Sequence, residues 1–143
     1  MKEKNKILVV IDTNVLVSSL FSKDGQSNPA LVISSILNEK IIPLYNSEII
    51  EEYREVLSRD KFRFPSYIVD NLVSVFEHFG IDTARTNVSD EVFPDSDDIV
   101  FYEVKMSEDE AFLVTGNLRH FPKNPLVVTP AQMIDILKEH NLL

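Results

Sequence analysis

The chain begins with a short, unbroken apolar run that ends in an acid. Residues 7–11 are all aliphatic, and Asp12 follows them directly. A run without polar alternation is typical of a strand that is covered on both faces, as in a parallel sheet. Because open parallel sheets bind ligands just outside the carboxyl ends of their strands, we expect Asp12 to lie where a functional site forms.

Apolar runs of strand length recur along the chain and alternate with helical patterns. Strands are predicted near Lys6–Asp12, Ile41–Tyr45, Ile81–Arg85, Ala111–Thr115 and Leu126–Val128. This alternation predicts an α/β fold, a three-layer α/β/α sandwich with a mainly parallel sheet of about five strands. The 143 residues, 44% of them hydrophobic, are enough for one core, so we expect a single domain over residues 1–143.

Capping residues and apolar spacing place helices between these strands. The predicted helices open at Asn28-Pro29, span about Ser47–Ser58, run from Pro65 to Gly80, cover Asp97–Met106 and open at Thr129-Pro130. The segment after Pro65 shows the clearest apolar face. The pattern of Asp97–Met106 fits neither a helical stripe nor strict alternation. We interpret it as a mostly buried helix, because a strand there would leave no crossover before Ala111.

Composition and charge exclude several classes of protein. The chain has no cysteine, which excludes disulfides and thiolate metal sites. Its first apolar stretch is too short for a signal peptide or a membrane span, so we expect a cytoplasmic protein without a membrane partner. The formal net charge of -9 argues against broad attraction to nucleic acid, although Arg54, Arg59, Lys61 and Arg63 form a local basic cluster.

Acidic side chains follow the ends of several predicted strands. Asp12 follows the first, Glu51 and Glu52 lie in the helix after the second, and the run Asp95–Asp98 precedes the fourth helix. The polar tripeptide Thr115–Asn117 follows another strand. Parallel strands bring these segments to one edge of the sheet. Magnesium and manganese prefer carboxylate oxygens, so the acids predict a metal site.

The helical period distinguishes the two neighbouring glutamates. The buried stripe of their helix is predicted to consist of Ile49, Ile50, Tyr53, Val56 and Leu57. Glu52 falls on the border of this stripe, whereas Glu51 points away from it. We therefore expect Glu52 to lean into a cleft and Glu51 to face solvent.

Each candidate also has a purely structural interpretation. Asp12 suits a turn or a helix cap, and Glu52 taken alone fits a surface charge better than a site. The acids of Asp95–Asp98 suit a helix N-terminus, but three of them exceed that need because adjacent like charges repel. On this interpretation Thr115–Asn117 is a plain turn, and we expect His120 to be a surface or packing residue rather than a ligand.

Four segments carry a joint motif in a fixed order along the chain. They are Ile7–Ser18 with Asp12-Thr13-Asn14 at its centre, Ser47–Leu57, Asp97-Asp98, and Leu113–Pro122. In this order and spacing they resemble the PIN domain family, and most of all its bacterial branch of toxin components from toxin-antitoxin systems. The similarity spans nearly the whole chain.

This resemblance implies a metal-dependent endoribonuclease whose acidic pocket holds Mg²⁺ or Mn²⁺. The family's pocket acids match Asp12, Glu52 and Asp98, with Asp95 or Asp97 as a further neighbour. Thr115 and Asn117 match polar positions beside the pocket, which completes the implied catalytic set. The resemblance also implies RNA as the substrate, an antitoxin protein that fills the acidic cleft, and assembly into a dimer.

The chain departs from the family pattern at the fourth acid of the pocket. Many relatives carry an aspartate at the position of Asn117 or shortly after it, where this chain has His120. A binding module that acts through protein or RNA partners without catalysis would also fit this loss of charge. A phosphatase with Asp12 as nucleophile fits less well, because such enzymes usually carry a second aspartate at the position of Asn14.

Overall fold

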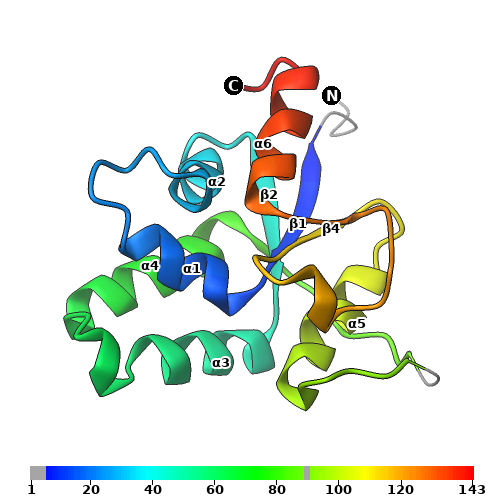
Figure 1. Ribbon diagram of the computed structural model, residues 1–143, viewed down its shortest axis with the longest axis horizontal. Coiled ribbons are helices and arrows are strands. Elements are labelled where there is room, and N and C mark those ends of the chain that lie inside the picture. The colour runs from blue at the N-terminus through cyan, green and yellow to red at the C-terminus, as the bar shows by residue number, and fades with distance from the viewer. Residues whose placement is uncertain (1–5, 89–90) are drawn as a thin grey trace.

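The computed structural model describes residues 6–88 and 91–143, and its centre is a five-stranded sheet (Figure 1). The strands are β1 (Ile7–Ile11), β2 (Ile41–Tyr45), β3 (Ile81–Asp82), β4 (Phe112–Val114) and β5 (Val127–Val128). Their order across the sheet is β3-β2-β1-β4-β5, and every neighbouring pair is parallel. The predicted α/β fold with a five-stranded parallel sheet is confirmed.

Six α-helices and three short 3-10 turns connect the strands over the described residues. The helices are α1 (Thr13–Leu20), α2 (Asn28–Leu37), α3 (Ser47–Leu57), α4 (Ser66–Phe79), α5 (Ile99–Met106) and α6 (Pro130–Glu139). The 3-10 turns are η1 (Asp60–Phe62), η2 (Ser96–Asp98) and η3 (Leu118–His120). None of the helices in residues 6–88 and 91–143 combines the length and the apolar character that a membrane crossing requires.

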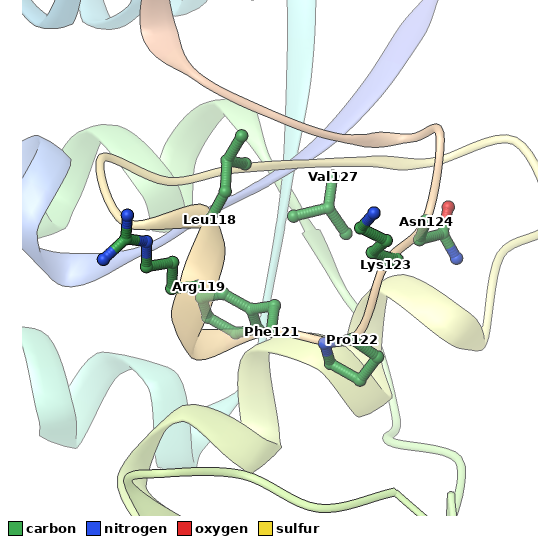
Figure 2. Close-up of a pocket in the computed structure, with 7 residues that line it drawn as sticks. All are labelled: Leu118, Arg119, Phe121, Pro122, Lys123, Asn124 and Val127. Carbon is green, nitrogen blue, oxygen red and sulfur yellow. The ribbon is translucent and has the colours of Figure 1, made fainter.

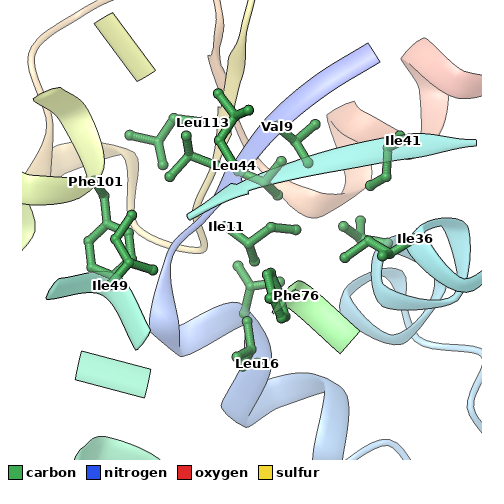
Figure 3. Close-up of a cluster of buried hydrophobic side chains, with 14 of the residues drawn as sticks. Val9, Ile11, Leu16, Ile36, Ile41, Leu44, Ile49, Phe76, Phe101 and Leu113 are labelled. Atoms are coloured by element: carbon green, nitrogen blue, oxygen red, sulfur yellow. The ribbon is translucent and has the colours of Figure 1, made fainter. Parts of the chain in front are cut away.

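Helices cover both faces of the sheet. Figure 1 shows α1, α2 and α4 on one side of the central strands and α5 on the other, where α5 contacts β1, β2 and β4. Helix α3 contacts α1, α4 and α5, so it closes the end of the molecule beyond the strand tips. Fully buried Ile11, Ile36 and Phe76 belong to the core shown in Figure 3. The apolar run of β1 is therefore covered from both sides, as its composition predicts.

The strand order fixes where a site can form. The central strand β1 lies between β2 and β4, so the residues that follow β1 and β4 emerge side by side. The ladder continues one step past each strand, because the Asp12 N–H donates to the Val114 carbonyl and the Thr115 N–H donates to the Val128 carbonyl, both at 2.9 Å. Asp12 and Thr115 therefore leave the sheet from backbone positions that the sheet itself holds.

Helix α1 is missing from the sequence-based prediction, which places the first helix at Asn28. The sequence of α1 contains β-branched residues and two serines, which are weak helix formers, so its local signal is poor. Burial of Val15 and Leu16 against the core supplies what propensity lacks. The expected cap of the next helix is also shifted by one residue, because the side chain of Ser27, not Asn28, accepts from the Ala30 N–H.

The predicted strand Ile81–Arg85 is wrong beyond Asp82. The Thr83 N–H still donates to the Tyr45 carbonyl at 2.7 Å, after which the chain leaves the sheet. Arg85 turns instead toward two acids on different helices, with 2.6 Å contacts to Glu48 of α3 and to Glu103 of α5. Tertiary ion pairing at Arg85 thus ends a strand that the apolar pattern would extend.

Candidate functional site

Asp12 directs its carboxylate at the neighbouring strand instead of capping its own helix. It occupies the N-cap position of α1, and its carbonyl accepts from the Val15 N–H at 3.0 Å. Its side chain makes no capping hydrogen bond. The Thr115 hydroxyl donates to Asp12 Oδ2 at 2.7 Å, and both side chains are buried. The carboxylate is therefore held at the ends of β1 and β4, and the capping interpretation of Asp12 does not apply.

Asp98 reaches the same end of the molecule from the start of α5. It sits at the junction of η2 and α5, is 8% exposed and makes no side-chain cap. His120 Nδ1 in η3 lies 3.0 Å from Asp98 Oδ2. His120 thus pairs with Asp98 in addition to the surface or packing role expected of it, and that it is not a ligand stays a prediction. The sequence offers no strong signal for this pair, because the two residues come from different segments and have no motif in common.

The pKa of each buried acid reflects the other acids around it. Burial, the charge of Asp12 and then the charge of Asp95 raise the pKa of Asp98 to about 6, against the opposing effect of His120. Burial also raises the pKa of Asp12, which the Thr115 hydroxyl and the charge of His120 lower in part. Because the charges of Asp12 and Asp98 interact, the two carboxylates form one electrostatic unit in which a cation would stabilise both.

Glu52 lies on the rim of this unit. Its side chain is half-buried, as its border position on α3 predicts. Burial and then the charge of Asp97 raise its pKa. It lines an acidic cleft of about 370 Å³ between α3 and the η2–α5 segment, together with Glu48, Glu51, Glu55, Arg85, Ser96, Asp97 and Val100. Glu51 is exposed as predicted, yet it also faces this cleft.

Asp95 and Asp97, the other acids of the run Asp95–Asp98, have different places in the structure. Asp95 has a structural role, and Asp97 lies at the rim of the site. Asp95 Oδ1 accepts from the Asp97 N–H at 2.9 Å and so caps η2, which agrees with its structural interpretation. Its charge nevertheless raises the pKa of Asp12, Asp98 and Glu52, so it acts on both the buried pair and the rim. Asp97 is exposed beside Glu52.

The turn after β4 is held by local hydrogen bonds. Thr115 Oγ1 accepts from the Asn117 N–H at 3.0 Å while it donates to Asp12. The Gly116 N–H donates to Asn14 Oδ1 at 3.3 Å, which ties this turn to the first turn of α1. Asn117 is half-buried, and the described residues make no hydrogen bond with its side chain. Its amide is therefore available to a ligand.

Tyr53 is a positioning residue, although its sequence pattern predicts only that it belongs to the buried stripe of α3. It is fully buried, and its hydroxyl donates to the carbonyl of Ile11 at 2.6 Å. That carbonyl belongs to the residue directly before Asp12. Burial and the charge of Asp12 raise the pKa of Tyr53 well above its ordinary value, so the hydroxyl stays protonated and donating. Tyr53 therefore fixes the strand end that carries Asp12.

The donor set suits a hard divalent ion by its chemistry. Asp12 and Asp98 present carboxylate oxygens, which Mg²⁺ and Mn²⁺ prefer, and His120 Nδ1 lies within hydrogen-bond distance of Asp98. Within residues 6–88 and 91–143, no three acidic or histidine side chains are grouped closely enough to form a ready-made ion cage. The residues that the structure brings together are thus Asp12, Thr115, Asp98 and His120, with Glu52 at the rim.

Comparisons with known proteins identify the family. The model of the PIN domain family matches residues 8–119, which is most of the chain. An uncharacterized protein of Methanocaldococcus jannaschii is 30% identical over 117 residues, which cover 80% of this chain and 74% of that relative. No solved structure matches the chain at the same level of significance. The chain belongs to the PIN domain family, whose members are typically nucleases that use divalent metal ions.

Proposed function

We propose that this PIN domain protein is a Mg²⁺- or Mn²⁺-dependent endoribonuclease that hydrolyses phosphodiester bonds in RNA. The observation that carries the proposal is the buried pair Asp12 and Asp98 near the carboxyl ends of β1 and β4. Their negative charges repel one another. Repulsion between two buried carboxylates destabilises the folded protein at neutral pH until a cation binds to them. Acids whose pKa is perturbed in this way are frequent at functional sites.

Asp12 and Asp98 would hold the metal ion, and Glu52, with Asp95 and Asp97 beside it, would complete the acidic surround. When bound, such an ion supplies positive charge to the scissile phosphate and lowers the pKa of water. Thr115 keeps Asp12 in place through its 2.7 Å hydrogen bond. His120 does the same for Asp98, and it adds a positive charge to the site when it is protonated.

The chemical step that follows is hydrolysis with water as the nucleophile. The water oxygen forms a new bond to phosphorus while the bond to the leaving ribose oxygen breaks, and this oxygen takes up a proton from solvent to leave as a hydroxyl. Glu52 at the rim, whose pKa is raised by burial and by the charge of Asp97, orients the water and accepts its proton. The free amide of Asn117 donates to a non-bridging phosphate oxygen.

The biological role that fits this activity is the toxin component of a toxin-antitoxin system, located in the cytoplasm. The support for it is the order and spacing of the four motifs that resemble the toxin branch. An antitoxin protein would then fill the acidic cleft beside Glu52, and the toxin would form a dimer. Light scattering of the purified protein tests the dimer, and co-purification with the product of a small neighbouring gene tests the antitoxin.

Cleavage of a single-stranded RNA by the purified protein tests the enzymatic proposal. We expect cleavage in Mn²⁺ or Mg²⁺ that EDTA abolishes. Asp12→Asn keeps the size of the side chain and removes its charge, so we expect it to reduce the rate at least about 100-fold. Asp135→Asn makes the same chemical change on the exposed face of α6 and should leave the rate unchanged.

Two results would overturn the endonuclease proposal. The first is full Mn²⁺-dependent cleavage by Asp12→Asn, which would show that the activity does not use this site. The second is the absence of cleavage of RNA oligonucleotides of mixed sequence by a folded protein in Mn²⁺. Circular dichroism and the melting temperature of each variant show whether it is folded.

A catalytically impaired binding module is the second candidate function. The observation that favours it is the contact of His120 with Asp98, which compensates one of the two buried acids within the protein. Calorimetric titration with Mn²⁺ distinguishes the two functions. A folded protein that binds RNA but not millimolar Mn²⁺ would support the binding module over the nuclease.

A further inference from the structure

A pocket of about 410 Å³ is lined by residues of the η3 turn and of the segment that follows it. Its wall is largely apolar and its rim carries two cations. The lining residues are Leu118, Arg119, Phe121, Pro122, Lys123, Asn124 and Val127, as Figure 2 shows. A pocket of this size and composition is within the range of natural small-ligand sites.

The pocket and the acidic site share one short turn. His120, at the end of η3, lies 3.0 Å from Asp98, and Thr115, three residues before η3, donates to Asp12. Leu118 and Phe121, within two residues of His120, form part of the pocket wall. A ligand in the pocket would therefore lie next to the segment that holds the acids.

The wall of the pocket is formed in advance by hydrogen bonds of the segment before β5. Asn124 Oδ1 accepts from the Leu126 N–H at 2.9 Å, and the Val127 N–H donates to the Asn124 carbonyl at 3.0 Å. Phe121 is buried, and its ring packs edge-on against Phe93. Little ordering is thus required when a flat, apolar group enters.

The charges at the rim are unusual for this chain. Arg119 and Lys123 are both exposed, and Figure 2 shows Arg119 at the left and Lys123 toward the right, beside Asn124, with Phe121 and Val127 between them in this view. The formal net charge of the protein is -9, so two cations beside one apolar pocket are a local exception. A nucleobase with a phosphate on either side has the complementary arrangement. Its flat ring suits the apolar pocket, and the negatively charged phosphates suit the two cations.

We propose that this pocket binds one nucleobase of a single-stranded RNA beside the scissile phosphate, and that Arg119 and Lys123 contact the phosphates on either side of that base. The proposal rests on the nuclease function and names how the same substrate is held. Base stacking on apolar and aromatic walls tolerates many sequences, so the pocket would set the register of cleavage more than its sequence preference.

Binding without cleavage tests this proposal directly. The probe is a fluorescently labelled single-stranded RNA octamer, titrated with the protein in EDTA and followed by anisotropy. We expect the double variant Arg119→Ala with Lys123→Ala to weaken binding at least 10-fold at low salt. Affinity falls with salt concentration, and a plot of the two logarithms should become less steep by about 1.4 in this variant. Each phosphate contact on a single strand contributes about 0.7 to the steepness.

The matched control removes two cations elsewhere. Lys40 and Lys138 are exposed, in the turn before β2 and in the last turn of α6. The double variant Lys40→Ala with Lys138→Ala has the same net charge as the test variant. We expect it to change the affinity less than 2-fold. An equal loss in both double variants would overturn the proposal, because it would show that only the overall charge matters.

A series of octamers, each with one base replaced by an abasic ribose, tests the pocket itself. We expect one position next to the cleaved bond to lose 5- to 20-fold in affinity for the wild-type protein. Leu118→Glu places a charge on the exposed pocket wall and should abolish that dependence. A flat abasic profile for the wild-type protein overturns the proposal, as does an unchanged profile in Leu118→Glu.

The failure of this proposal can be separated from the failure of the nuclease function. Wild-type cleavage in Mn²⁺ together with unchanged binding by the Arg119 and Lys123 variant would reject the pocket and keep the nuclease. Base-dependent binding without any cleavage would keep the pocket as a site for an RNA base and reject the nuclease.

Discussion

His120 Nδ1 lies 3.0 Å from Asp98 Oδ2, although 22 positions separate the two residues in the chain. The contact favours the ionised form of the carboxyl and lowers the pKa of Asp98, which burial and the charge of Asp12 raise. His120 therefore offsets part of the repulsion between the two buried acids. The charge of the candidate site depends on a residue outside its acidic motif.

Replacing His120 with Ala should move Mn²⁺ binding to higher pH. Without the ring, the pKa of Asp98 rises further, so the carboxylate form that binds a cation appears only at a higher pH. Calorimetric titrations between about pH 5.5 and 8 measure the half-maximal pH. His140→Ala, an exposed histidine at the end of α6, is the control. The same half-maximal pH in wild type and His120→Ala would contradict the prediction.

Asp98→Asn should stabilise the metal-free protein at pH 7.5. The pKa of Asp98 in the folded protein, about 6, lies above its ordinary value of 3.8, so folding favours the protonated carboxyl. The resulting stabilisation is complete below about pH 4 and is lost as the pH rises through about 6. Asn mimics the protonated form, so we expect a gain of about 1 to 3 kcal/mol at pH 7.5 and a smaller gain at pH 5.

Urea denaturation in EDTA at the two pH values measures this effect. Asp135→Asn, which removes an exposed charge from α6, is the control and should be neutral at both. A loss of stability in Asp98→Asn at pH 7.5 would show that the contact with His120 outweighs the repulsion from Asp12. A gain in stability with a loss of cleavage would fit an acid retained for function.

Tyr53→Phe should destabilise the protein by about 1 kcal/mol, because it removes the hydroxyl that donates to Ile11 and leaves a buried acceptor without this partner. The ring stays, so its packing against Phe76 is kept. Urea denaturation measures the change. Tyr67→Phe loses a hydroxyl on an exposed side chain and serves as the control. Equal effects of the two substitutions would argue against a positioning role for Tyr53.

Arg85→Ala should cost about 2 kcal/mol or more. Glu103 is 6% exposed and accepts from Arg85 at 2.6 Å, so the substitution leaves a buried charge without its cation. Arg54→Ala breaks the exposed contact with Asp70, and we expect it to cost about 0.5 kcal/mol. Chemical denaturation of the two variants compares these costs. Similar values would contradict the prediction.

Local sequence patterns were sufficient for the positions of the strands, except for the end of β3, and for most helices. The apolar run of β1, the capping box of Thr129 and the apolar stripe after Pro65 are short-range signals, and the helices and strands form where those signals lie. The order of the motifs was also sufficient for the PIN domain family, because it does not require knowledge of contacts. The same signals missed α1, whose stability comes from the burial of Val15 and Leu16 instead of helix propensity.

The sequence by itself determined that acids follow the strands, since a buried parallel strand ending in Asp12 leaves the acid at a known edge. Only the tertiary structure decided which partner each acid has. The side chain of Asp12 is hydrogen-bonded to Thr115, that of Asp98 contacts His120, and that of Asp95 caps its own turn. The contacts of Asp12 and Asp98 depend on distances between segments far apart in the chain, and their energy comes from burial and charge that no local pattern records. The cap formed by Asp95 is local, which is why the sequence could suggest it.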